Sequence, residues 1–224
     1  VLLILAENVT IQNGTVKNTR TAKSSPAVMV GKFDATGMML TVKNVNFIGS
    51  ITAVTPRASA LSVQPSNVAK VENGTFTGGI YVEGSLTMTG GSATSLELGY
   101  SYGTIQLSGG SFDRISIQQQ DYASLLAKGY AYQVSGQLVK PEGMAKGIAV
   151  EVVKCGHPDG LTDTEACAYC GLKCAHPGID STTGNCTVCG LFRATASVAA
   201  GGTTTYFADF SAAVDAAKAA SGST

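Results

Sequence analysis

The sequence contains no tryptophan, few charged residues and no basic cluster. Charged residues make up 13% of its 224 residues, and 15 basic residues balance 15 acidic ones. A nucleic-acid-binding protein needs a basic face, so we expect no nucleic-acid partner. The apolar run that opens the chain spans only residues 1–6, which is too short for a signal peptide or a membrane span. We therefore expect no membrane insertion of this segment.

Histidine is absent from residues 1–154, and the acidic residues of that region are scattered. Glycoside hydrolases need paired carboxylates, and lyases need clustered carboxylates with a basic residue that abstracts a proton. Neither arrangement is evident, so we predict that the chain is not an enzyme. The isolated acids are Asp34, Glu72, Glu83, Glu97, Asp113 and Asp121.

A short phrase returns five times in the first 140 residues. It reads "TIQNGTVKN" (10–18), "TVKNVNFIG" (41–49), "KVENGTFTG" (70–78), "TMTGGSATS" (87–95) and "QLSGGSFDR" (106–114). One aligned column holds a turn residue and another holds an apolar residue. The turn column is Asn13, Asn44, Asn73, Gly90 and Gly109, and the apolar column is Val16, Phe47, Phe76, Ala93 and Phe112.

An irregular repeat with a strand–turn–strand pattern predicts one coil per repeat. Each coil would stack on its neighbours and bury a continuous core. Asn in the turn column favours a left-handed backbone. This pattern resembles the right-handed parallel β-helix of pectin-lyase-like proteins, so we expect an all-β solenoid. A pair of antiparallel β-sandwich modules is the alternative.

Residues 121–142 are predicted to cap the solenoid with a short helix and a final strand pair. Asp121 is a suitable N-cap, Tyr122, Leu125 and Leu126 form an apolar face, and Gly129 would end the helix. Covering the last coil would protect its open strand edges. The expected β-helical domain with its cap spans residues 1–148.

All six cysteines and both histidines lie in one doubled motif, C-x-H-x9-C-x2-C. Its eight residues are Cys155, His157, Cys167, Cys170, Cys174, His176, Cys186 and Cys189. In each Cys-x2-Cys-Gly the glycine frees the backbone so that amides can point at the sulfurs, as in a zinc knuckle. Three cysteines and one histidine form a closed tetrahedral shell for structural zinc. We predict two Zn²⁺ ions that stabilise residues 149–192, whose apolar content is too small for a core.

Other arrangements of the doubled motif stay open. Six cysteines allow fifteen disulfide pairings. Disulfides would not explain why each histidine has the same spacing from the cysteines in both repeats. Redox chemistry at Cys-x2-Cys is a further possibility. The simplest zinc grouping gives one site per repeat. A central site from Cys167, Cys170, Cys174 and His176, with the outer four paired, and a crossed grouping are the alternatives.

Residues 193–224 are predicted to form two strands and a helix that begin a further module. Asp209 would cap the helix, and Phe210, Ala213, Val214 and Ala217 would form its inward stripe. The stretch "GTTTYFADFSAAVDAAKAA" (202–220), following a C-x-H…C-x-x-C-Gly spacer, resembles a cassette of modular surface proteins from Gram-positive gut and oral bacteria.

That resemblance implies a secreted, surface-anchored, adhesin-like protein of which this chain is an excised part, with the signal peptide and anchor outside it. We expect a non-enzymatic structural or adhesion module, whose partners are neighbouring domains and a host or microbial surface glycan or protein. The alternatives are a carbohydrate-active β-helix or glycan-binding module, and a Cys/His block that docks a protein.

Overall fold

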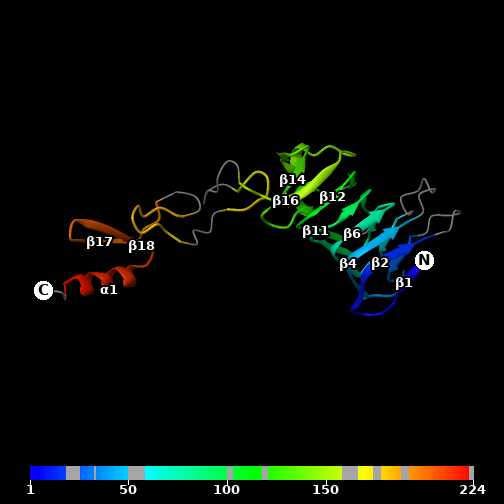
Figure 1. Cartoon of the computed structure of the whole chain (residues 1–224), viewed down its shortest axis with the longest axis horizontal. Coiled ribbons are helices and arrows are strands. Elements are labelled where there is room, and N and C mark those ends of the chain that lie inside the picture. Colours follow the sequence, from blue (N-terminus) through cyan, green and yellow to red (C-terminus); the bar gives the residue numbers. More distant parts are fainter. Residues whose placement is uncertain are drawn as a thin grey trace. The chain divides into compact units, whose positions relative to one another are not determined.

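The structure is a computed structural model that describes residues 1–18, 26–32, 34–49, 59–99, 103–117, 121–157, 166–173, 178–187 and 192–221. The chain divides into two compact units, Val1–Cys155 and Gly156–Thr224. In Figure 1 the first unit runs from blue through green, and the second continues from yellow to red.

Two β-sheets make up most of the first unit. Sheet A contains six parallel strands, β1 (Leu2–Ile4), β3 (Val28–Val30), β5 (Leu61–Val63), β7 (Ile80–Val82), β10 (Leu96–Leu98) and β13 (Ile115–Ser116). The parallel part of sheet B contains β2 (Val9–Lys17), β4 (Met39–Ile48), β6 (Val68–Thr77), β8 (Ser85–Met88), β9 (Ser92–Ala93), β11 (Thr104–Leu107) and β12 (Gly110–Phe112).

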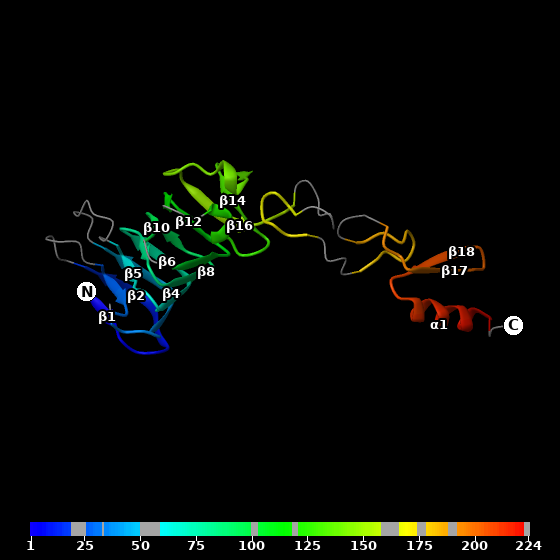
Figure 2. The same cartoon turned by 180° about the vertical axis from the view of Figure 1, so that it is seen from behind.

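The chain passes back and forth between the two sheets. Strands β1, β3, β5 and β7 belong to sheet A. After each of them the chain forms a strand of sheet B, which is β2, β4, β6 or β8 in turn. Both sheets are parallel along this path, as Figure 1 and Figure 2 show from opposite sides. The prediction of a parallel, β-rich architecture is confirmed, and the antiparallel sandwich alternative is wrong.

The apolar column of the sequence repeat is a column in the structure. Val16 pairs with Phe47, Phe47 with Phe76, Phe76 with Ala93, and Ala93 with Phe112. From Phe47 onward these side chains are at most 4% exposed. Because successive strand residues face opposite sides of a sheet, the residues on either side of each member point away from this interior.

Stacked turns explain the Asn and Gly residues of the repeat. Asn13 and Asn44 both have φ of 52°, the left-handed conformation that Asn tolerates better than most residues. At the third turn Gly74 has φ of 151°, and the Gly74 amide donates to the Asn73 side-chain oxygen. A Cβ on Gly74 would lie 2.6 Å from the carbonyl oxygen of Val45 on the paired strand β4, so the neighbouring strand leaves no room for a side chain.

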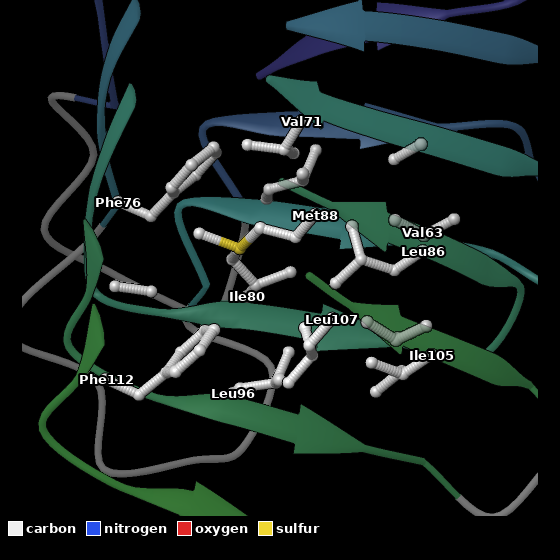
Figure 3. Packing of buried hydrophobic residues seen from close by; sticks show 14 of the residues in the cluster. Val63, Val71, Phe76, Ile80, Leu86, Met88, Leu96, Ile105, Leu107 and Phe112 are labelled. Atoms are coloured by element: carbon white, nitrogen blue, oxygen red, sulfur yellow. The ribbon is translucent and has the colours of Figure 1, made fainter. Parts of the chain in front are cut away.

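Side chains from both sheets fill one hydrophobic core. Figure 3 shows Phe76 and Phe112 of sheet B pointing into the same interior as Ile80 and Leu96 of sheet A. Phe47 and Phe76 stack edge to face, with ring centroids 5.3 Å apart. This core is the principal apolar interior of the described residues.

The segment predicted as a cap follows β13, the last strand of sheet A. Residues Tyr122–Leu125 form a 3-10 helix, η1, whose Ala123 amide donates to the Asp121 carboxylate, and Leu125 is fully buried. The antiparallel strands β14 (Tyr130–Val134), β15 (Gln137–Val139) and β16 (Val150–Lys154) then extend sheet B from β12, with the 3-10 turn η2 (Pro141–Gly143) before β16. The Asp121 N-cap and the final strand pair are confirmed, but the expected end at Gly129 is wrong, because the helix ends at Leu125.

The second unit ends in the predicted strands and helix, β17 (Ala196–Ala200), β18 (Thr203–Phe207) and α1 (Phe210–Ser221). Figure 2 shows α1 beside the β17–β18 hairpin. Asp209 caps α1 by accepting hydrogen bonds from the Ser211 and Ala212 amides, as predicted. The inward stripe is partly wrong, because Ala213 is buried but Phe210 is 66% exposed and Ala217 is exposed as well.

Candidate metal centre

Four ligand residues of the first sequence repeat lie together. The Sγ atoms of three cysteines and a ring nitrogen of one histidine all lie within 4.8 Å of one another. The residues are Cys155, His157, Cys167 and Cys170. The simplest grouping predicted from the sequence, one site per repeat, is the arrangement that these four residues adopt.

Strand β16 delivers the first ligand. Cys155 follows Lys154, the last residue of β16, and its amide donates to the carbonyl oxygen of Gly129 at 2.8 Å. Cys155 is 4% exposed. The backbone hydrogen bond extends the β14–β16 pairing by one position, so the thiol is held at the end of a regular ladder.

His157 reaches the cluster through an unusual backbone conformation. Its φ is +49°, a left-handed value that is uncommon for residues other than Gly, although His adopts it more often than most, as Asn and Asp do. The Nδ1 atom of His157 lies 3.6 Å from Sγ of Cys170. Backbone strain of this kind concentrates at functional sites, where the surrounding contacts maintain it.

Cys167 and Cys170 occupy a tight turn. The amides of Cys170 and Gly171 both donate to the carbonyl oxygen of Cys167, at 3.3 and 2.8 Å, and the Cys167 amide donates to Leu172 at 2.7 Å. Gly171 has φ of 72°, which a side chain would disfavour. The glycine after the second cysteine therefore suits the backbone of this turn.

The environment of Cys167 favours its thiolate. Burial alone would raise the pKa of this thiol, but hydrogen bonds from His157 and from the backbone amides of Tyr169 and Cys170 outweigh it and lower the pKa to about 7 from 9.0. The thiolate is the form of cysteine that binds metals. The turn therefore prepares Cys167 as a metal ligand near neutral pH.

The four donors suit a tetrahedral thiophilic metal ion. Zinc–sulfur bonds of about 2.3 Å in a tetrahedron separate the sulfurs by roughly 3.8 Å, which is compatible with ligand atoms that all lie within 4.8 Å. Three thiolates and one imidazole would fill four positions and leave none for water or substrate. Such a closed shell is typical of structural rather than catalytic zinc.

The second repeat is described only in part. Cys174, His176 and Cys189 lie outside the described residues, so the structure does not place them. Cys186 is 2% exposed, and it forms an isolated antiparallel bridge with Ile179. The turn between them is held by Asp180, whose carboxylate accepts from the Thr182 and Thr183 amides; these bonds lower its pKa. No disulfide joins any two of the four cysteines that the structure describes.

One pocket with two acidic residues in its lining was not predicted from the sequence. A cavity of about 500 Å³ lies where β12, β14 and β16 meet, and Asp113 and Glu151 are among its lining residues. Asp113 is isolated in the sequence, because Glu151, the other acidic residue that lines the cavity, is far from it along the chain. The only available signal was the alternation of polar and apolar residues in both strands.

Comparisons with protein-family models, curated proteins and solved structures find no match to this chain. Among the helices of the described residues, none combines the length and apolar character that crossing a membrane would require.

Proposed function

We propose that this chain is a non-enzymatic module of a secreted, surface-anchored bacterial protein, in which structural zinc stabilises the Cys/His-rich part. The observation that carries the proposal is the closed set of Cys155, His157, Cys167 and Cys170. The surface location and the bacterial origin rest on the sequence resemblance. The alternation of strands between two parallel sheets supports a right-handed parallel β-helix for the first unit.

The proposal includes a second zinc ion, held by Cys174, His176, Cys186 and Cys189. Its support is the spacing of the second sequence repeat, which matches that of the first. The burial of Cys186 agrees with a ligand role. A metal is useful here because a small domain with few large apolar side chains lacks the burial needed to fold.

The test is the metal content of the purified protein, measured by native mass spectrometry together with a titration of free thiols. We expect two zinc ions per chain and six thiols that react only after chelation. Cys170→Ser should remove one zinc ion, Cys186→Ser should remove the other, and the exposed control Ser197→Ala should keep both. A protein with no metal and no reactive thiols under denaturing conditions would contain disulfides, and the proposal would be wrong.

A further inference from the structure

A continuous row of polar side chains crosses the outer face of sheet B. Thr75 on β6 pairs with Ser92 on β9, Ser92 with Ser111 on β12, Ser111 with Glu151 on β16, and Glu151 with Gln133 on β14. We call these five residues the polar row. With neighbouring strands about 4.8 Å apart, it extends over roughly 19 Å.

The polar row faces away from the core. The residues beside its members in the chain, Phe76, Ala93, Phe112, Val150 and Tyr132, are at most 4% exposed. Side chains alternate between the two faces of a strand, so the row lies on the opposite face. Thr75 and Glu151 are exposed, and the other three members are half-buried.

The row ends in the pocket at the cap. The cavity of about 500 Å³ has a mixed lining. Its polar residues are Ser111, Asp113, Gln133, Ser135 and Glu151, and Phe112, Gly136, Ala149 and Val150 complete it. Within the described residues neither Asp113 nor Glu151 has an ion-pair partner. Both carboxylates are therefore available to accept hydrogen bonds from a ligand.

The side chains of the polar row and the pocket indicate which class of ligand they could bind. Hydroxyls, a carboxamide and two carboxylates suit a ligand rich in hydroxyl groups. Among the described residues no basic side chain lines the pocket, so its two carboxylates would repel a polyanion. The exposed large apolar residues of the described chain, Val1, Leu2, Leu5, Phe192 and Phe210, all lie off the row. The row therefore lacks the apolar anchors of a protein interface.

We propose that the polar row and its pocket bind an uncharged polysaccharide. A chain of hexose units repeats over a length similar to the strand spacing, so successive sugars can meet successive members of the row. Asp113 and Glu151 would accept hydrogen bonds from hydroxyls of the sugar in the pocket. This inference rests on the function proposed above, a surface-anchored module, because it supplies a binding surface for that module.

The test is affinity gel electrophoresis of the full chain in gels that contain a soluble polysaccharide. The uncharged probes are a mixed-linkage β-glucan, an arabinoxylan and a galactomannan, and polygalacturonate is the polyanionic comparison. We expect at least one uncharged probe to retard the protein, and polygalacturonate to leave its mobility unchanged. Asp113→Ala and Glu151→Ala should each weaken retardation about tenfold, since each removes hydrogen bonds to a charged acceptor.

Glu142→Ala is the matched control, because Glu142 is an exposed carboxylate of the cap that does not line the pocket. It should bind like the unaltered protein. Circular dichroism of each variant checks folding. Ser92→Val removes a hydroxyl of the polar row without altering charge, and it should also weaken retardation. Retardation by no uncharged probe, or equal retardation of all variants, would overturn the inference. If the chain holds zinc but binds no polysaccharide, the inference of polysaccharide binding is wrong, whereas the proposal of a zinc-stabilised module stands.

Discussion

The two compact units of the chain differ in what fills their interiors. In the first unit, 29 buried residues from both sheets and the cap form a single hydrophobic cluster. Among the described residues of the second unit, the buried apolar residues are Cys170, Cys186 and Ala213. Two of those three are cysteines of the doubled motif.

The two units are therefore stabilised in different ways. Strands of the two parallel sheets bury apolar surface between them, and this burial stabilises the first unit. The second unit has little apolar surface to bury, and a metal ion can supply the missing free energy of folding. We expect the two units to respond to opposite perturbations.

Metal removal gives the largest expected effect. Adding a zinc chelator should abolish hydrogen-exchange protection in residues 166–173 and 178–187, because metal binding and folding are coupled in small metal-stabilised domains. Protection in β4 and β6 of the first unit should not change. Hydrogen exchange followed by mass spectrometry measures both regions in one experiment. Unchanged protection in the second unit after complete metal loss would show that metal does not stabilise it.

A core substitution should produce the reverse pattern. Phe76→Ala removes a fully buried ring that contacts Phe47, and it should lower the free energy of unfolding of the first unit by about 3–5 kcal/mol. Urea denaturation followed by circular dichroism measures the loss. The control Lys70→Ala, an exposed position on the same strand, should cost about 0.5 kcal/mol or less. Zinc content should be the same in both variants, and a loss of zinc in Phe76→Ala would break the comparison.

The smallest effect concerns pH. Because the pKa of Cys167 is lowered to about 7, its thiolate is available without proton release above that pH, and stabilisation from the thiolate is lost as pH falls through about 7. The apparent zinc affinity should therefore fall by about tenfold per pH unit below pH 7 from this residue alone. Competition with a chromophoric chelator between pH 5.5 and 8 measures the affinity. A constant affinity across that range would contradict a ligand role for Cys167.

Much of the first unit was predictable from local pattern. The apolar column from Val16 to Phe112 was aligned by sequence alone, and every neighbouring pair in it is a strand partner in the structure. Strand periodicity of two and the turn residues Asn13 and Asn44 are local properties, so they are visible in one sequence. The orientation of Phe210 was not predictable, because helical periodicity shows which residues share a face but not whether a neighbour covers the first turn.

The candidate metal centre was predictable for a different reason. Cysteine and histidine are rare in this chain, and their repeated spacing by itself indicated a shared chemical role. The spacing did not show the left-handed backbone of His157 or the hydrogen bonds that lower the pKa of Cys167. Those depend on three-dimensional contacts between Cys167, His157 and the turn.

The repeated strands, their buried apolar column and the candidate ligand types follow from local sequence, since each depends on residues that are close together or regularly spaced. Only the tertiary structure decided which polar residues meet at the cap. Glu151 lies between Ser111 and Gln133 because β16 returns antiparallel beside β12 and also pairs with β14. Long-range strand pairing of this kind depends on how the whole chain packs, and no local pattern of residues specifies it.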